Sequence, residues 1–409
     1  MSVTSAYRTG VRVLRGSPML AAMGAGWLAS EFPPKVVTAR ALAAVGGDRV
    51  DHLARLLAAQ GADTAVDMAL RRTFGASYAD DVCHPVQHVA TPSRPVPRRR
   101  RHAAFISDIP YGPGGRAHLL DIWRRADQQP DHHAPVLLQI PGGAWTMNDK
   151  RGQAYAQMAR MVELGWICVA INYRRSPSHS WPAHIVDVKR ALAWVRRHIA
   201  DFGGDPDFIA LTGGSAGGHL CALAALTANE HRWQPGFESA DTTVQAAVPY
   251  YGVYDLTNVD SMHPMMLPFL ERVVFKSRFA EDSGTFRRAS PIFHVKSSAP
   301  PFFVLHGDRD PIVPSSQARL FCTALGRAGA QTIAHAELPN AAHAFDTATS
   351  LRSHVVADAV AAFLGVVYGR HLRRSAGSSA RLRALFMPDA SLTLPSNSLS
   401  VRAAAGNHG

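Results

Sequence analysis

Cysteine is scarce in this chain of 409 residues, and its four cysteines stand far apart. They are Cys83, Cys168, Cys221 and Cys322, and no two of them form a C-x-x-C pair. This spacing argues against a disulfide-bonded scaffold and against a cysteine-based zinc site. We therefore expect reduced thiols, most of them buried, and no metal site.

The sequence also lacks a run of about 18 consecutive apolar residues, which a membrane-spanning helix requires. The best candidate, residues 18–29, is short and interrupted by glycine, and three arginines precede it. It matches a signal peptide poorly; a helix at a membrane surface is the alternative to a buried one. We expect no transmembrane helix, and a location in the cytoplasm or at the periphery of the cell envelope.

Acidic residues are outnumbered by basic ones, 31 against 43, which gives a formal net charge of +12. Ten of these twelve charges come from residues 94–101 and 370–409, so the rest of the chain is nearly balanced. Such charge runs are typical of solvated linkers and tails, and no nucleic-acid-binding motif accompanies them. We expect no specific nucleic-acid partner and leave open a peripheral contact with an anionic membrane surface.

From residue 103 onward, short apolar segments alternate with amphipathic helical segments. Strands are predicted at 118–123, 134–140, 166–172, 208–212, 244–250, 301–306 and 332–338, and helices at 185–199, 318–326 and 355–367. Most of these strands are apolar and β-branched, as strands covered on both faces are. The pattern predicts an α/β domain over residues 103–368, built on a mostly parallel, doubly wound sheet with helices on both faces.

The remaining segments differ from this domain in composition. Residues 1–90 are alanine-rich with helical spacing around 50–57 and 65–72, and we interpret them as a helical segment and candidate cap. Residues 91–102 are predicted to be a Pro/Arg-rich linker, and 369–409 a disordered basic tail. Residues 256–290 contain a methionine-rich run that is either a lid insertion or an ordinary packed helix.

One glycine-rich motif carries the strongest chemical signal. Gly213, Gly214, Ser215, Ala216 and Gly217 have the form G-x-S-x-G and lie between the predicted strand 208–212 and an apolar helix. A sharp strand-to-helix turn strains the serine backbone and brings neighbouring backbone close, so the flanking positions must be small. This context indicates a nucleophilic serine presented at the end of a sheet.

A serine nucleophile needs a base and an acid, which follow it along the chain in hydrolases with this turn. Asp308 and Asp310 both follow the strand 301–306; we favour Asp310 as the acid and interpret Asp308 as a turn-capping residue. His343 is the predicted base, because it lies in a small-residue loop after the strand 332–338. His219 and His306 are predicted to be structural.

The tetrahedral intermediate of acyl transfer also needs hydrogen-bond donors for its oxyanion. One donor is the backbone N–H of Ala216, directly after the nucleophile. The loop after the strand 134–140 supplies the other candidates, Gly142, Gly143 and Ala144, since small residues let the backbone approach an acyl group. Trp145 is a candidate for the wall of the acyl pocket. The chemistry calls for no cofactor.

With these residues assembled, residues 105–367 resemble the hormone-sensitive-lipase-like and acetyl-esterase branch of the α/β-hydrolases, especially actinobacterial carboxylesterases of the Lip type. The shared stretches are PGGAW, INYRRSP, LTGGSAGGHL, YYGVYD, SPIFHV, HGDRDPIVP and NAAHAF. The resemblance implies the triad Ser215, Asp310 and His343. It also implies oxyanion donors from Gly143, Ala144 and Ala216, with Gly142 supporting the loop.

The chain departs from the family pattern at two positions of that loop. Pro141 stands where the family usually has histidine, and Ala144 where a third glycine is common. Proline has no N–H, so we expect the loop to be held by backbone rigidity instead of a histidine hydrogen bond.

The expected function is hydrolysis of small carboxylic esters with short to medium acyl chains through an acyl-serine intermediate. Two alternatives stay open: an arylformamidase-like amide hydrolase, since such relatives share a Gly-Gly-x-Trp loop, and a hydrolase-fold binding protein without turnover. The complete set of serine, acid and histidine argues against the second. The sequence does not predict an oligomeric state.

Overall fold

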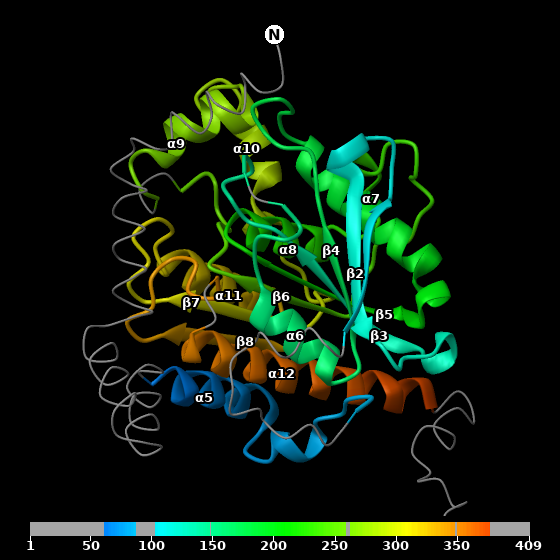
Figure 1. Ribbon diagram of the computed structural model, residues 1–409. Helices are drawn as coiled ribbons and strands as arrows, with labels where there is room; N and C mark the ends of the chain where they lie inside the picture. Colours follow the sequence, from blue (N-terminus) through cyan, green and yellow to red (C-terminus); the bar gives the residue numbers. More distant parts are fainter. Residues whose placement is uncertain (1–60, 87–102, 148, 259–261, 348–349, 377–409) are drawn as a thin grey trace, which may run out of the picture. The chain divides into compact units, whose positions relative to one another are not determined.

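The computed structural model describes residues 61–86, 103–147, 149–258, 262–347 and 350–376 (Figure 1). The predicted helical run at 50–57, the linker at 91–102 and the tail beyond residue 376 lie outside these residues. The described residues up to Gly369 belong to one compact unit.

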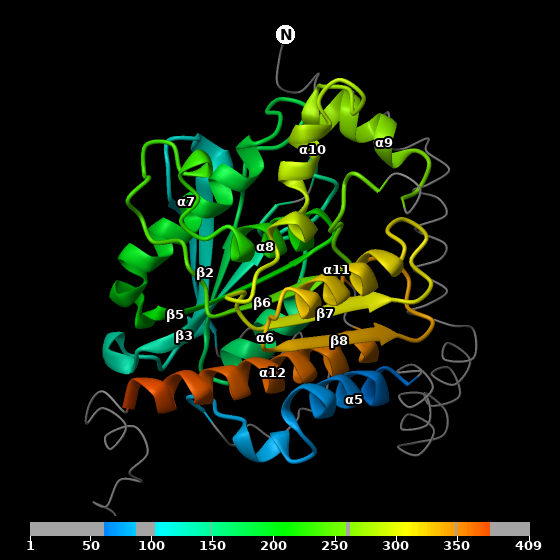
Figure 2. The same cartoon turned by 180° about the vertical axis from the view of Figure 1, so that it is seen from behind.

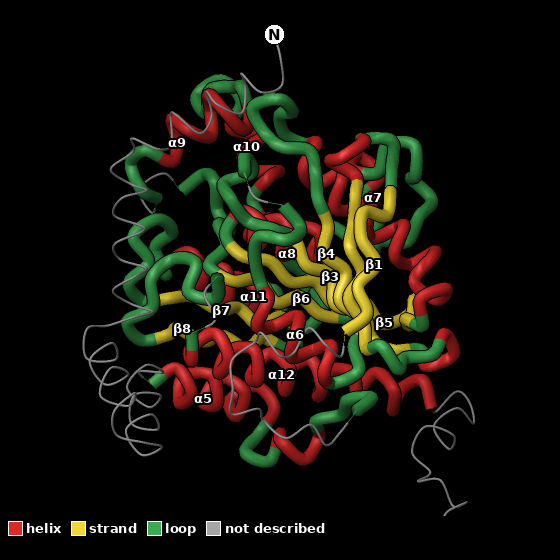
Figure 3. Tube along the Cα trace, in the orientation of Figure 1, coloured by secondary structure: helices red, strands yellow, loops and turns green. Residues whose placement is uncertain are grey.

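An eight-stranded sheet forms the centre of this unit, and Figure 3 shows its strands side by side. Its strands are β1 (Ala103–Pro110), β2 (Leu119–Arg125), β3 (Ala134–Ile140), β4 (Ile167–Ile171), β5 (Gly204–Gly214), β6 (Ala246–Tyr250), β7 (Phe302–Gly307) and β8 (Ile333–Leu338). The order across the sheet is β1-β2-β4-β3-β5-β6-β7-β8. β2 is antiparallel to both of its neighbours, and the strands from β4 to β8 pair in parallel. The carboxyl ends of the parallel strands therefore share one edge, where ligand sites form in such sheets.

Helices cover both faces of the sheet (Figures 1 and 2). They are α5 (Ala62–Phe74), α6 (Tyr155–Glu163), α7 (Ala183–His198), α8 (Ala216–Leu226), α9 (Met266–Phe269), α10 (Ser283–Ala289), α11 (Ser316–Arg327) and α12 (Leu351–Ala376). Side-chain alternation along β7 shows the two layers, because neighbouring residues of a strand point to opposite faces. The ring of Phe302 lies 5.5 Å from that of Phe321 on α11, whereas Phe303 lies 5.3 Å from Phe363 on α12.

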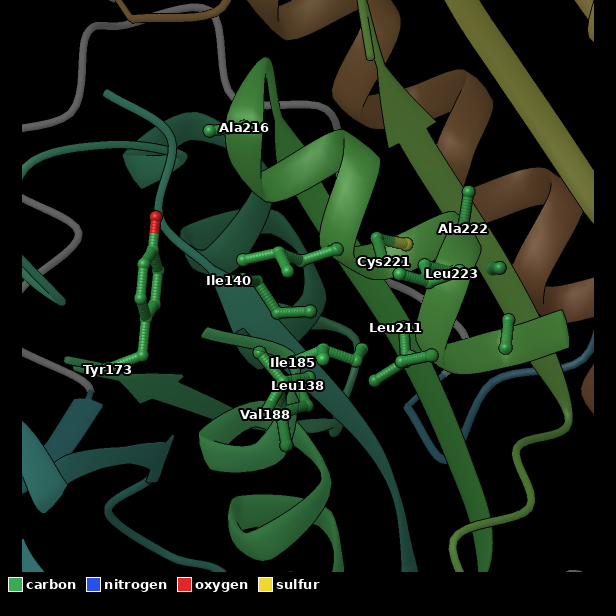
Figure 4. Packing of buried hydrophobic residues seen from close by; sticks show 14 of the residues in the cluster. Leu138, Ile140, Tyr173, Ile185, Val188, Leu211, Ala216, Cys221, Ala222 and Leu223 are labelled. Atoms are coloured by element: carbon green, nitrogen blue, oxygen red, sulfur yellow. The ribbon is translucent and has the colours of Figure 1, made fainter. Parts of the chain in front are cut away.

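The larger half of the core lies between the sheet and helices α7 and α8. Leu138 and Ile140 of β3 and Leu211 of β5 are fully buried there. Figure 4 shows them packed against side chains of α7 and α8, including Ile185 and Cys221. Helix α8 is apolar all round and wholly buried, so the serine turn that precedes it rests on a rigid support.

Helix α12 is the one described helix that is long and apolar enough to cross a membrane, but 67% of its apolar window is buried inside the protein. Tyr368 packs against Trp166 and Phe208, and Phe363 against Phe303 of the sheet. These contacts identify α12 as a core helix of the α/β unit.

Helix α5 packs on the edge strand β8 and also contacts α12 through Phe74. Thr73, near its carboxyl end, donates to the carbonyl of Ile333 at the start of β8, whereas Gly61, at its amino end, lies against Pro339 after β8. The helix therefore runs antiparallel to β8, and its amino end lies at the sheet edge that carries the strands' carboxyl ends.

The two ends of the segment 256–290 lie next to each other. The backbone N–H of Leu256 donates to Ser290 Oγ, and that of Ile292 donates to the carbonyl of Tyr254. Within the segment, α9 continues into a π-helical turn, Leu270–Phe275, and Leu270 is fully buried. Its apolar residues are thus largely packed into the core, while Met265 is 61% exposed.

The fold class predicted from the sequence is confirmed, and all seven predicted strands are present. β1 was not predicted, because this antiparallel edge strand has no buried apolar run and includes Ser107, Asp108 and Pro110. The last helix extends to Ala376, past the predicted start of the tail at residue 369.

Candidate active site

Ser215 occupies a strained turn between β5 and α8, with φ 57° and ψ −119°. The glycines on either side of Ser215 make this turn possible. A Cβ on Gly213 would lie 2.6 Å from the carbonyl oxygen of Gly217, and one on Gly217 would lie 2.2 Å from that of Ile140. The predicted need for small residues around the serine therefore has a direct cause: three backbone segments pass within van der Waals contact of each other.

His343 joins the serine to an acid. Its Nε2 lies 2.9 Å from Ser215 Oγ, and its Nδ1 lies 2.6 Å from Asp310 Oδ2. A carboxylate only accepts hydrogen bonds, so Nδ1 carries the proton and Nε2 is free to accept one from the serine hydroxyl. The structure thus brings together the three residues predicted as the triad, from the ends of β5, β7 and β8.

The acid is buried and ionised. Burial raises the pKa of Asp310, but the nearby imidazoles of His343 and His306 outweigh it and hold that pKa well below its ordinary value. Oδ1 also accepts the backbone N–H groups of Ile312 and Val313, each at 2.9 Å.

The turn after β7 corrects one prediction. Asp310, not Asp308, accepts the hydrogen bonds that cap this turn, and Asp308 is exposed. One carboxylate fills both roles because its two oxygens face different partners. His306 supports it as predicted: Nε2 donates to the carbonyl of Val313 and lies 3.3 Å from Asp310 Oδ2.

The loop after β3 has an unusual backbone. Gly143, Ala144 and Trp145 have φ values of 106°, 52° and 58°. Among the described residues, the backbone N–H groups of Gly143, Ala144 and Ala216 have no hydrogen-bond partner. Gly143 and Ala144 are partly exposed, so their N–H groups are available to a bound acyl group.

Gly142 differs from the other three residues of the predicted oxyanion hole, because its backbone N–H already has a hydrogen-bond partner. Its N–H donates to Gln153 Oε1 at 2.7 Å, and a Cβ here would lie 2.3 Å from the carbonyl oxygen of Gly214. Gly142 therefore spaces the loop against the serine turn and has no N–H left to offer. Pro141 contributes its carbonyl, which accepts from Tyr173 at 3.0 Å. Side-chain hydrogen bonds from Gln153 and Tyr173 thus hold the loop, which the expectation of backbone rigidity alone did not include.

Trp145, predicted as a pocket wall, is 2% exposed, which leaves little ring surface for a substrate. Its indole N–H donates to His219 Nδ1 at 3.2 Å, and the two rings meet edge to face at 5.2 Å. His219 is buried in α8, and its Nε2 donates to the carbonyl of Ala289 at 2.7 Å. It holds structure together, as predicted, but it does so beside the serine.

Sequence reasoning missed Tyr251 and Asp346. The ring of Tyr251 lies 4.6 Å from that of His343, and its hydroxyl donates to Asp346. Burial, followed by the charge of Asp346, raises the pKa of Tyr251 well above its ordinary value. The stretch YYGVYD was noted as shared with esterases, but only the folded chain shows that Tyr251 packs beneath the histidine. Gln153 was also missed, because nothing in the sequence links it to Gly142.

No group of three or more His, Cys, Asp or Glu side chains in the described part of the chain is arranged to hold a metal ion. The arrangement of Ser215, His343 and Asp310 supplies a nucleophile, a base and an orienting acid. Together with backbone donors at the same sheet edge, it has what acyl transfer requires.

Comparison with known proteins agrees with this fold. The profile of the BD-FAE family matches residues 120–325. The esterase LipQ of Mycobacterium tuberculosis is 58% identical over 383 residues, 91% of each chain. The probable carboxylic ester hydrolase LipM of the same organism is 59% identical over 269 residues, 66% of this chain and 62% of LipM.

A solved structure of a truncated carbohydrate esterase from gut microbiota superimposes with a TM-score of 0.56 and 24% identity. It covers 64% of this chain and 96% of that one, and it supports the fold alone. The sequence relatives extend over most of the chain. This protein therefore belongs to the BD-FAE family of α/β-hydrolases, among the Lip-type esterases.

Proposed function

We propose that the protein hydrolyses carboxylic esters of short to medium acyl chains, with Ser215 as nucleophile. Ser215 Oγ attacks the ester carbonyl carbon while His343 Nε2 takes the hydroxyl proton. His343 then gives this proton to the departing alcohol, which leaves an acyl-serine. Water attacks the acyl group, its proton passes to His343, and the carboxylic acid leaves as Ser215 recovers its proton. Asp310 holds the imidazole tautomer and stabilises the imidazolium.

The observation that carries this proposal is the bridge made by His343. Its two ring nitrogens lie 2.6 Å from Asp310 and 2.9 Å from Ser215, within hydrogen-bond reach of both. Ser215 is partly exposed while His343 and Asp310 are buried, so a substrate reaches the nucleophile and not its supporting groups. We assign the oxyanion to the N–H groups of Gly143, Ala144 and Ala216.

The expected preference for modest acyl chains is supported by the segment 256–290. Residues such as Leu270, Val274 and Phe286 are buried in the core, and Val274 accepts a backbone hydrogen bond from Trp181 at 2.9 Å. Through Ala289 the segment also contacts α8 one turn after Ser215. We propose that the segment forms a wall of the acyl pocket, and a packed wall leaves less room for a long chain than a mobile lid would.

A panel of p-nitrophenyl esters from acetate to palmitate, run on wild type and Ser215→Ala, tests the proposal. We expect highest kcat/KM between two and eight acyl carbons, and loss of all enzymatic turnover in Ser215→Ala. A fluorophosphonate probe should add its mass to the peptide that contains Ser215. An aryl formamide hydrolysed faster than the matching aryl acetate would favour an amide hydrolase, and a folded protein that never labels would favour a binding protein.

We also propose that residues 103–368 are the catalytic domain, with the helical segment 1–90 as a cap. The position of Gly61 beside Pro339 supports the cap, because it places the amino end of α5, which belongs to residues 1–90, at the sheet edge that carries the site. A variant that lacks residues 1–60 should change KM for bulky esters more than for acetate. Equal KM values for wild type and the truncated variant across the ester panel would refute the cap.

For the location we propose the cytoplasm or the periphery of the cell envelope. The arginine-rich stretches at 94–101 and 370–409 are suited to an anionic membrane surface. Binding to vesicles that contain anionic lipid should fall steeply as salt rises. Equal binding to neutral vesicles would contradict this.

A further inference from the structure

His219 connects three parts of the active-site region that the chain supplies separately. It follows Ser215 by one turn of α8, and its backbone N–H donates to the serine carbonyl at 2.9 Å. Its Nδ1 accepts from the indole of Trp145, and its Nε2 donates to the carbonyl of Ala289. The two ring nitrogens thus have opposite roles, which only the neutral ring can fill. Burial lowers the pKa of His219 to about 4, so the ring is neutral at neutral pH.

We call the loop after β3, residues 141–145, the oxyanion loop. Trp145 is the last of its three consecutive residues with positive φ. Ala144 and Trp145 both have a left-handed backbone, which costs an L-residue with a side chain about 1 kcal/mol or more. Such a conformation persists only where surrounding contacts hold it. The backbone N–H of Ser176 donates to the carbonyl of Trp145 at 2.9 Å, and the indole hydrogen bond to His219 is its side-chain anchor.

The third partner of His219 is the exit of the segment 256–290. Ala289 is the last residue of α10, and the next residue, Ser290, accepts the backbone N–H of Leu256 at the entrance of the segment. Ser290 Oγ in turn donates to the carbonyl of Phe286 at 2.8 Å. The imidazole therefore contacts the junction where the two ends of the segment meet.

We infer that His219 is a positioning residue of the esterase reaction, which fixes the oxyanion loop to the nucleophile helix by accepting the Trp145 N–H. The inference rests on the proposed function of Ser215 and its donors. Because the loop donors act most strongly on the charge that develops in the transition state, loss of the tether lowers kcat and leaves KM nearly unchanged. A misplacement of about 1 Å in a catalytic group can cost about 100-fold in rate.

Two amide substitutions separate the two hydrogen bonds. In His219→Asn, the side-chain oxygen stands near the place of Nδ1 and keeps an acceptor for Trp145. In His219→Gln, the amide nitrogen reaches the place of Nε2 and keeps only the donor to Ala289. We expect kcat for p-nitrophenyl acetate within about threefold of wild type in His219→Asn and lowered about 10- to 100-fold in His219→Gln, with KM within about twofold in both. Equal losses in the two variants, or a larger loss in His219→Asn, would overturn the inference.

Trp145→Phe removes the donor from the other side and does not depend on how the His219 variants fold. We expect a similar loss of kcat, and His219→Gln added to Trp145→Phe should lower kcat by less than a further threefold. Independent, multiplying losses would mean that the two residues act separately, and the tether would be refuted. Rates are divided by the fraction of enzyme that a fluorophosphonate labels, so an unfolded fraction does not count as lost catalysis.

The chain offers a matched control on the other edge of the sheet. Trp166 donates its indole N–H to His84 Nδ1 at 3.1 Å, and burial lowers the pKa of His84 to about 4 as well. Trp166 precedes β4, so this pair lies at the amino ends of the parallel strands, away from Ser215. His84→Gln should leave kcat within twofold of wild type. A wild type without ester turnover would refute the proposed function itself, whereas an active wild type with unaffected His219 variants would refute only the tether.

Discussion

Replacing Asp310 with asparagine tests how the acid controls the histidine. The carboxylate faces donors on every side: Ile312 and Val313 donate to Oδ1 at 2.9 Å, and His343 donates to Oδ2 at 2.6 Å. A carboxylate accepts all of these hydrogen bonds. An amide of the same shape has one acceptor and one donor end, so it cannot satisfy both the turn and the histidine.

The turn decides which way the amide lies. If the amide oxygen faces His343, its NH2 group opposes the two N–H groups of Ile312 and Val313, and two buried donors lose their acceptor. That loss costs about 2 kcal/mol or more, a preference of roughly 30-fold for the opposite orientation. In the preferred orientation the NH2 group donates to His343 Nδ1, which must then be unprotonated. The ring proton moves to Nε2, and this nitrogen no longer accepts the proton of Ser215.

We therefore expect Asp310→Asn to lower kcat/KM for p-nitrophenyl acetate by roughly 10³- to 10⁴-fold, in line with the loss that the wrong histidine tautomer causes in serine hydrolases. The control is Asp308→Asn, which changes the exposed aspartate of the same turn and should stay within twofold of wild type. Both variants are first compared with wild type by thermal unfolding. A folded Asp310→Asn that keeps more than a tenth of wild-type kcat/KM would refute the tautomer argument.

Three further predictions follow from other contacts. In Gly217→Ala the new Cβ would meet the Ile140 carbonyl at 2.2 Å, which displaces the oxyanion loop by about 1 Å, so kcat per labelled site should fall about 100-fold; a loss below threefold would contradict this. Burial lowers the pKa of Lys189 to about 7, so between pH 7 and 10.5 the folded state binds fewer protons than the unfolded state, and stability rises with pH. From pH 7 to 9 the unfolding free energy in urea should rise by about 2 kcal/mol more in wild type than in Lys189→Met, and parallel curves would exclude the shift. Tyr251→Phe removes the hydrogen bond to Asp346 and should lower the unfolding free energy by about 1.5–3 kcal/mol with less than a tenfold change in kcat; an unchanged denaturation midpoint would rule this out.

The parts of the fold that could be predicted are those whose surroundings impose a strong pattern. β3 is buried at every position, and its apolar run, interrupted only by Gln139, is the pattern of a parallel strand covered on both faces. β1 lies at the sheet's edge with one side exposed, so its sequence is under weaker constraint and gave no signal. Asp310 and His343, in contrast to β1, could be predicted. Their order along the chain and their positions after strands located both, because the fold brings the carboxyl ends of those strands to one edge.

Contacts between residues distant in the chain could not be predicted in the same way. Gln153 takes the N–H of Gly142 eleven residues away, and no spacing rule links the two. Trp145 follows the glycines of the oxyanion loop, which suggested a pocket wall, but the direction of a side chain depends on backbone angles that sequence alone does not fix. With φ at 58°, the indole points to α8 and not to the substrate side.

These unpredicted contacts have a common physical origin in the cost of the oxyanion loop. Ala144 and Trp145 hold left-handed backbones at about 1–2 kcal/mol each, and the N–H groups of Gly143 and Ala144 stay unpaired so that a substrate can use them. The loop therefore gains little stability from its own sequence and depends on contacts from elsewhere: Tyr173 on the carbonyl of Pro141, Gln153 on Gly142, and His219 on the indole. A loop whose N–H donors stay unpaired until a substrate binds needs contacts from residues outside the loop to stabilise its conformation. Catalytic residues are thus easier to recognise in the sequence than the residues that hold them in place.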